Sequence, residues 1–194
     1  MRHEIATSIT ESSTKAAAPR WAWWIATGFG SGWMKPAPGT WGSAAALLAW
    51  CVLTGLTATP FATWASRHPG SRGLPALWIL AECLFLLLPA AMAWIAVLAS
   101  DRVVRETGEV DPGYIVADEW AGLWIALWPL RWDIAWNLFR FNTPGCWRWL
   151  PLLLVPFAFF RLFDIWKPWP VRQLQALPGG QGIVADDVVA GLYA

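Results

Sequence analysis

The feature that most constrains the fold is an apolar run of about 26 residues, 74–99, with one charged side chain, Glu82. A helix of that length is long enough to cross the hydrocarbon core of a bilayer. Composition agrees, because 57% of the 194 residues are hydrophobic and only 14% are charged, whereas soluble domains carry about 25% charged residues. Eighteen tryptophans suit a membrane–water interface or a large aromatic core. The sequence therefore predicts an all-α, membrane-associated helical bundle with several transmembrane or interfacial helices.

The rest of the chain is divided by further apolar runs at 43–58, 120–130 and 147–160. Residues 1–20 are rich in Ser, Thr and Ala and lack the basic-then-apolar order of a signal peptide, so we expect a disordered tail. We expect residues 21–194 to form a single domain, with an interfacial segment at 131–149. No internal repeat is evident.

Composition also excludes several classes of protein. A net charge of +1 offers no basic surface for nucleic acid. Two histidines, His3 and His68, are too few for a His-based triad or a multi-His metal site. The cysteines are odd in number and lie in or beside apolar runs, which favours small buried side chains in a reducing compartment: Cys51, Cys83 and Cys146.

A glycine-rich segment, Gly28 to Ser43, reads GFGSGWMKPAPGTWGS. Five glycines and two prolines argue against a regular helix or a central strand. Its backbone N–H groups could cradle an anion, and Lys35, Thr40 and Ser43 add phosphate-binding donors. It lacks the Gly-Lys-Ser/Thr ending of a P-loop, and a plain interhelix connector would look similar.

Charged residues gather at the ends of two other apolar runs. Asp118 and Glu119 open the helix expected at 120–130, with Asp111 shortly before them. Arg161, Asp164 and Lys167 are spaced by three, so they share a stripe at a helix end that Pro168 and Pro170 close.

A third charged group follows three glycines, Gly179, Gly180 and Gly182, which we expect to form a flexible joint. An apolar helix is expected to restart around the adjacent pair Asp186–Asp187. Helix caps and interfacial salt bridges would explain all three charged groups without any catalytic role. For Glu82 no partner is evident, and we assign it no role.

The order of polar and apolar segments suggests where the charged groups lie. Two apolar runs separate the glycine segment from Asp118–Glu119, and two more separate that pair from Arg161. An even number of crossings returns the chain to the same side each time. Nearby Lys15, Arg20 and Lys35 favour the cytoplasmic side, although Arg67 and Arg72 would then lie opposite. The run at 120–130 is short for a span, so we expect that this helix dips into the membrane without crossing it.

Grouped on one side, these residues suit phosphate chemistry. Oxygen ligands without His or Cys favour a hard cation such as Mg²⁺, and Arg and Lys would hold the remaining phosphate oxygens. Metal-assisted transfer of a lipid headgroup phosphate to water is the leading hypothesis. A transporter or ion-binding protein with a carboxylate relay is the alternative, and it predicts charges buried at mid-membrane.

The segments GFGSGWMKPAPGTWGS, DPGYIVADEWAG, FRLFDIWKPWP and GGQGIVADDVVAG resemble, in this order, the phosphatidylglycerophosphatase A family. The resemblance covers Gly28 to Gly191, and the last two segments are its most specific part. It implies an all-α enzyme of the bacterial inner membrane, and the crossing count with the nearby basic residues favours an active site on the cytoplasmic side. Such an enzyme removes the terminal phosphate of phosphatidylglycerophosphate and depends on Mg²⁺. The expected partner is the phospholipid substrate in the membrane, with no obligatory protein partner evident.

The resemblance also implies roles for individual residues. Catalytic roles fall to Asp118, Glu119, Asp164 and Asp187, and the same four with Asp186 are the expected Mg²⁺ ligands. Substrate phosphate would be bound by Arg161, Lys167, Lys35, Gly39 and Thr40. Attack by a carboxylate on phosphorus and activation of water both use these residue types. Relatives continue into a further apolar helix after the acidic pair, whereas the residues from Asp187 on cover only about 12 Å of helix.

Overall fold

The computed structural model describes residues 17–68, 76–131 and 150–194, and all regular structure within them is helical. In chain order the elements are α2 (Arg20–Ala26), the 3-10 helix η1 (Ser31–Trp33), α3 (Pro38–Arg67), α4 (Ala76–Thr107), α5 (Ala117–Leu127), the 3-10 helix η2 (Trp128–Leu130), α7 (Leu150–Trp166), α8 (Val171–Leu174) and α9 (Gly180–Tyr193). The predicted all-α class is confirmed. Most of the expected tail and nearly all of the expected interfacial segment at 131–149 lie outside the described residues.

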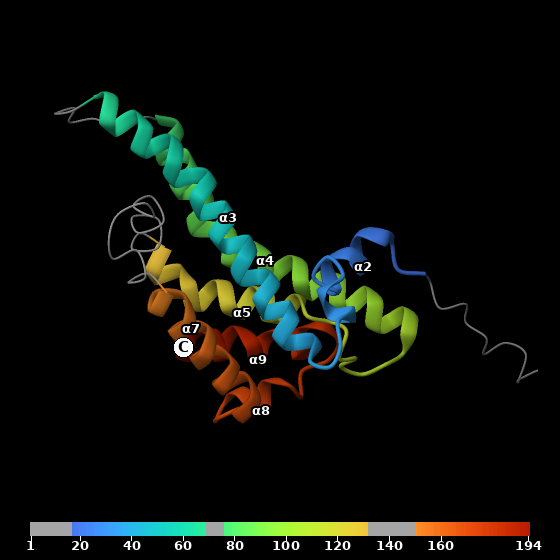
Figure 1. The fold of residues 1–194 in the computed structure, drawn as a ribbon. Helices are drawn as coiled ribbons and strands as arrows, with labels where there is room; N and C mark the ends of the chain where they lie inside the picture. The colour runs from blue at the N-terminus through green and yellow to red at the C-terminus, as the bar shows by residue number, and fades with distance from the viewer. Residues whose placement is uncertain (1–16, 69–75, 132–149) are drawn as a thin grey trace, which may run out of the picture.

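Two long helices, α3 and α4, run side by side and project beyond the other helices (Figure 1). Within the described residues, Pro38–Arg67 and Trp78–Thr107 are long and apolar enough to cross a membrane. Only 22% and 28% of their most apolar stretches are buried inside the protein, so most of that surface faces outward. Soluble proteins rarely expose so much contiguous apolar surface.

Helix α3 begins earlier than the glycine-rich segment predicted. Residues 28–37 precede it and include only the short 3-10 helix η1, and Pro38 occupies the start of α3, where its missing N–H is no loss. Gly42 therefore lies in the first turns of α3, where a Cβ atom would come within 2.6 Å of the Val116 side chain. Glycine at this position brings the start of α3 close to the residue that precedes α5.

Helix α5 is the central helix of the protein. Its residues are almost all buried, and it packs against α3, α4, α7 and α9. The largest side chains of this core are Trp50, Phe85, Trp120, Leu123, Trp124, Leu127, Leu153 and Phe160. Burying this apolar area is the main force that holds the shorter helices against α3 and α4.

Glu82, for which no partner was evident in the sequence, forms an ion pair with a buried arginine. Its carboxylate lies 2.6 Å from the guanidinium of Arg131, which follows η2. Arg131 also donates a hydrogen bond to Thr57 at 3.0 Å and lies 4.0 Å from the ring of Phe85. This pair ties the end of η2 to both long helices.

The cysteines only partly follow the prediction of buried side chains. Cys51 is half-buried, whereas Cys83 is exposed on α4, and both are free thiols. Cys83 lies on an outward face of an apolar helix, so its hydrophobic surroundings in the sequence did not mean burial in the protein. Cys146 lies outside the described residues.

Candidate functional site

The charged segments meet in one polar pocket of about 360 Å³ at one end of the protein. The start of α3, the start of α5, the end of α7 and one face of α9 form its walls. The polar and charged residues that line it are Thr40, Asp111, Asp118, Glu119, Arg161, Asp164, Lys167, Asp186 and Asp187, together with the backbone of Gly39. The expectation that distant segments share one site is therefore met.

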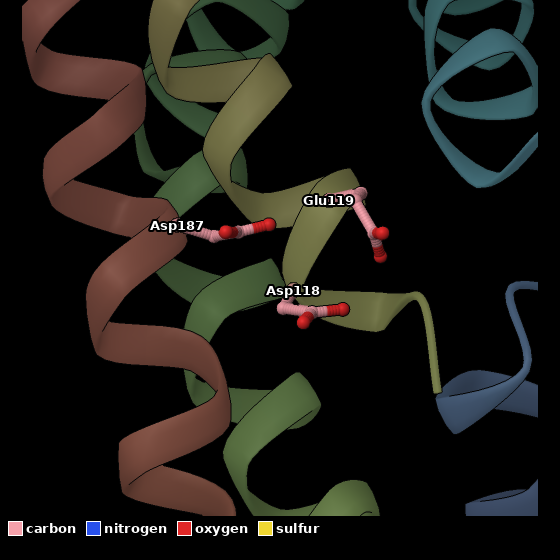
Figure 2. A group of neighbouring side chains, drawn as sticks. All are labelled: Asp118, Glu119 and Asp187. Atoms are coloured by element: carbon pink, nitrogen blue, oxygen red, sulfur yellow. The ribbon is translucent and has the colours of Figure 1, made fainter. Parts of the chain in front are cut away.

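Three carboxylates form the inner part of the pocket. Asp118 and Glu119 project from the first turn of α5, and Asp187 reaches toward them from α9 (Figure 2). One carboxylate oxygen from each lies within 4.8 Å of the other two. The N-terminal end of α5 carries a partial positive charge, which favours Asp118 and Glu119 in their ionised forms.

Close packing of α5 on α9 places Asp187 within reach of α5. A Cβ atom at Gly191 would overlap the backbone oxygen of Gly122, and a Cβ at Gly122 would come within 2.5 Å of the Asp187 backbone oxygen. Sequence reasoning missed this role of Gly122. The available signal was that each glycine follows an acidic residue at helical spacing, Gly122 three residues after Glu119 and Gly191 four after Asp187.

The acidic pair Asp186–Asp187 lies inside a helix and does not begin one. Helix α9 already starts at Gly180, so Gly180 and Gly182 are helical and the expected flexible joint is limited to Gly179 and the residues before it. Gly180 lies against the backbone of Val97 and Asp101 on α4. Gly180 thus allows close packing of α9 on α4, and Gly182 allows α9 to lie against the backbone of Gln175 and Leu177.

Both basic residues of the pocket are paired with carboxylates. The Arg161 guanidinium lies 2.6 Å from Asp164 and 3.6 Å from Glu119. The Lys167 ammonium lies 2.6 Å from Asp186. Helix α7 ends at Trp166, so Lys167 follows the helix with a positive φ of 47° instead of continuing the predicted stripe. That turn directs Lys167 toward α9.

Negative charge is in excess in this pocket. Six carboxyl groups line it, against the two cations Arg161 and Lys167. Burial, with neighbouring carboxylates adding to it, raises the pKa of Asp118 and of Asp187 well above the usual range. Burial also raises the pKa of Glu119 to about 8, with Asp187 and Asp164 adding to the effect and Arg161 opposing it. A bound cation would relieve this repulsion.

The inner carboxylates also have unused ligand atoms. Among the described residues, Asp118 Oδ1, Glu119 Oε2 and Asp187 Oδ2 are buried without a hydrogen-bond partner. Unsatisfied buried oxygens are costly, and a metal ion is one way to satisfy several at once. The donor set is all oxygen, which fits a hard divalent cation. The cluster could therefore bind a metal.

The glycine-rich segment contributes less than the sequence predicted. Gly39 and the exposed Thr40 line the pocket, and a Cβ at Gly39 would overlap Glu119 Oε1 and come within 3.1 Å of Arg161. A side chain at position 39 would therefore displace the Glu119 carboxylate and crowd the Arg161 guanidinium where α3 approaches them. Lys35, however, is exposed and does not line the pocket, so its predicted role in phosphate binding finds no support in this geometry.

These features define a class of protein: a helical protein with two apolar helices long enough to cross a membrane and an acidic pocket that could bind a metal beside Arg161 and Lys167.

Comparison with known proteins identifies the family. The sequence model of the family described as phosphatidylglycerophosphatase A matches residues 24–194. Two bacterial phosphatidylglycerophosphatases A are similar over 171 residues, 88% of this chain: that of Haemophilus influenzae at 33% identity, over 82% of its length, and that of Escherichia coli K12 at 32%, over 77%. The chain belongs to the phosphatidylglycerophosphatase A family, a family of lipid phosphatases, as the sequence resemblance indicated.

A third relative carries a different name. A putative phosphatidylinositol-3-phosphatase of Bacteroides thetaiotaomicron is 35% identical over 170 residues, 88% of this chain and 86% of that protein. Family membership therefore indicates a phosphatase acting on lipids but leaves the headgroup open. No solved structure matches the chain.

Proposed function

We propose that the protein hydrolyses phosphatidylglycerophosphate to phosphatidylglycerol and inorganic phosphate with the help of Mg²⁺. One observation carries the proposal: the half-buried Asp118 and the buried Glu119 and Asp187 converge within 4.8 Å in a pocket that also holds Arg161 and Lys167. The carboxylates would hold Mg²⁺, and the two cations would hold the substrate phosphate. The names of the relatives from Haemophilus influenzae and Escherichia coli support this substrate.

Each lining residue has a proposed part in the reaction. Asp118, Glu119 and Asp187 are the inner Mg²⁺ ligands, and bound Mg²⁺ supplies a Lewis acid for the phosphoryl oxygens. Asp164 orients the guanidinium of Arg161 through their 2.6 Å contact, and Asp186 does the same for the Lys167 ammonium. Arg161 can bind two phosphate oxygens at once, whereas Lys167 acts as a point charge.

The location follows from the apolar helices. We place α3 and α4 across the bacterial inner membrane with the pocket at the cytoplasmic surface. Basic residues near the pocket end, Arg20, Lys35, Arg102 and Arg105, support this orientation under the positive-inside rule. Val110 is 92% exposed in the loop after α4, so a Val110→Cys variant would react with a membrane-impermeant thiol reagent in inside-out vesicles and not in intact cells. The opposite pattern would contradict the orientation.

The activity is tested by phosphate release from phosphatidylglycerophosphate in vesicles that contain the purified protein, with and without Mg²⁺. We expect release that stops with a chelator and falls by at least about a hundredfold in Asp187→Asn, because several kcal/mol of transition-state stabilisation depend on the metal. Asp101→Asn is the matched control, since Asp101 makes a surface pair with Arg105. Phosphate release that is unchanged by the chelator and by Asp187→Asn would refute the metal assignment.

The substrate is tested in the same assay with a panel of lipids. Phosphatidylinositol 3-phosphate and phosphatidic acid are compared with phosphatidylglycerophosphate at equal surface concentration. The proposal requires the highest kcat/KM on phosphatidylglycerophosphate. Preference for phosphatidylinositol 3-phosphate would instead support the activity named for the Bacteroides thetaiotaomicron relative.

A further inference from the structure

A second feature of the pocket-bearing end is a group of exposed aromatic side chains on α2, on η1 and in the turn between them. Trp24 and Phe29 are each 59% exposed and Trp33 is 57% exposed. These three residues, called the aromatic patch below, line a shallow cleft of about 610 Å³ together with Arg20. Aromatic surface of this kind is costly in water and marks a site of interaction.

The aromatic patch is held in place from beneath. The ring of Trp33 stacks on Tyr114 at 4.7 Å and on Trp23 at 6.2 Å. The indole N–H of Trp23 donates a hydrogen bond to Glu106 at 2.8 Å, which fixes this stack to the end of α4. The exposed rings therefore present a preformed surface and lose little conformational entropy on binding.

The aromatic patch also lies beside the pocket. The ring of Phe29 is 5.6 Å from that of Trp120, the residue that follows Glu119. Helix α3 starts at Pro38, five residues after Trp33, so the patch lies at the end of an apolar helix that we place in the membrane (Figure 1). The aromatic patch therefore lies at the depth of the membrane surface.

The chemistry of the cleft indicates what it binds. Trp and Phe rings favour the boundary between lipid headgroups and acyl chains, where one part of the ring is apolar and the indole N–H stays hydrated. Arg20 is exposed, and no carboxylate is among the described residues that line this cleft. A surface of aromatic rings with an exposed cation complements anionic phospholipid.

We propose that the aromatic patch inserts into the headgroup region of an anionic phospholipid bilayer and holds the mouth of the pocket at the depth of the substrate phosphate. Substrate would then reach the pocket by lateral diffusion in the membrane. This inference rests on the proposed membrane location and lipid substrate, but it assigns a separate surface with its own residues.

Depth is measured directly by spin labels, without any activity. Single cysteines replace Trp24 or Trp33 in a variant whose Cys51, Cys83 and Cys146 are alanine, and the labelled protein is placed in phosphatidylcholine–phosphatidylglycerol vesicles. We expect labels at both positions to be reached by oxygen and shielded from a water-soluble nickel complex. A label at Val110→Cys is the aqueous control, since Val110 is 92% exposed. Labels at 24 and 33 as accessible to nickel as the control would overturn the proposal, as would shielding that appears only when another protein is added.

Kinetics provide the second arm. For Trp24→Ala/Trp33→Ala we expect the apparent KM for substrate in vesicles to rise about tenfold with kcat retained, and hydrolysis of a soluble short-chain substrate to stay unchanged. Arg20→Gln should raise the apparent KM for the vesicle substrate about fivefold, and only when the surrounding vesicle lipid is anionic. Trp94→Ala is the control, because Trp94 is 69% exposed but lies in the middle of α4.

The two proposals fail in different ways. Equal loss on the soluble and the vesicle substrate would overturn the docking role, because the patch would then act within the pocket. A wild-type protein that releases no phosphate in either form, while its labels at 24 and 33 remain shielded by lipid, would refute the proposed activity and leave the docking surface supported.

Discussion

At the scale of single residues, the site is governed by charge held near the protein interior. Arg161 contacts both Asp164 and Glu119, so it connects α7 to the start of α5. Its side chain is only 17% exposed, and in such a place its charge acts through a lower dielectric than at the surface. The planar guanidinium can also satisfy two oxygens at once, which an ammonium group cannot do.

Arg161→Lys tests this geometry while keeping the charge. We expect kcat/KM for the lipid substrate to fall by about tenfold, equivalent to about 1.4 kcal/mol of transition-state binding, because a lysine cannot bind the phosphate in bidentate fashion. Arg102→Lys serves as the control, since Arg102 is exposed and lies against Trp21. Steady-state kinetics in vesicles at saturating Mg²⁺ give the comparison, and equal values for both variants would remove Arg161 from phosphate binding.

At the scale of helices, contact between α5 and α9 assembles the metal-binding cluster. Gly122 and Gly191 allow the two backbones to approach, and this approach brings Asp187 next to Asp118 and Glu119. The opposite end of α5, which continues into η2, is held by an ion pair. Glu82 and Arg131 link α4 to the end of η2, about one α5 length away from the acidic residues.

Gly191→Ala should separate α5 from α9. Its Cβ would overlap the backbone oxygen of Gly122, and overpacking of this kind costs about 1–3 kcal/mol. Mg²⁺ affinity should fall with stability, because Asp187 moves away from α5. Gly55→Ala in α3 is the control: a Cβ there meets nothing within 4 Å, and alanine should be neutral or stabilising. Thermal unfolding and Mg²⁺ titration of the two variants measure the difference, and matching behaviour would contradict the packing argument.

Loss of the carboxylate that pairs with the buried Arg131 should be costly. We expect Glu82→Ala to lower the free energy of unfolding by about 3–5 kcal/mol, because it leaves the charge of Arg131 buried without its carboxylate. Asp101→Asn breaks an ion pair whose arginine side chain is 76% exposed, and it should cost no more than about 1 kcal/mol. Unfolding in mixed micelles compares the two variants. Similar small losses would show that the Glu82 pair is energetically equivalent to a surface pair.

At the scale of the whole molecule, one end carries the charge and the other projects as two apolar helices (Figure 1). The charged end stores unfavourable electrostatic energy, since six carboxyl groups share one pocket with two cations. Folding stability should therefore depend on pH and on divalent ions together.

The direction in which stability changes with pH follows from the raised pKa of Glu119. Its pKa is raised from 4.5 in the unfolded chain to about 8 in the folded protein, first by burial and then by neighbouring carboxylates. A raised carboxylate pKa gives stability that is fully present below about pH 4.5 and is lost as the pH rises toward 8. In a chelator we expect the melting temperature to fall across this range.

Added Mg²⁺ should restore the melting temperature most strongly near pH 8, because it binds the deprotonated carboxylates. Asp187→Asn should weaken both the decline with pH and the rescue by Mg²⁺. Melting curves at several pH values, with chelator or with Mg²⁺, provide the measurement. A melting temperature independent of pH in chelator would contradict the raised pKa values.

Much of the site was predictable from the sequence because its charged residues fall within a few short segments. Carboxylates and cations at the ends of apolar runs are costly unless paired or bound, so Asp118, Glu119, Asp164, Asp187, Arg161 and Lys167 could be named without coordinates. The all-α class followed from the length of the apolar runs and the low charge. Lys35 illustrates the limit, since a basic residue in a glycine-rich segment looks suitable whether or not it faces the pocket.

The sequence by itself thus determined the helical class, the apolar helices and the residue types of the site, because these depend on local composition and spacing. Only the tertiary structure decided that α5 is an interior helix, that α9 begins at Gly180, that Glu82 pairs with Arg131, and that α5 and α9 meet through Gly122 and Gly191. Each of these depends on contacts between residues far apart in the chain. Such contacts are chosen by packing and by the pairing of buried charge, which no single segment of sequence contains.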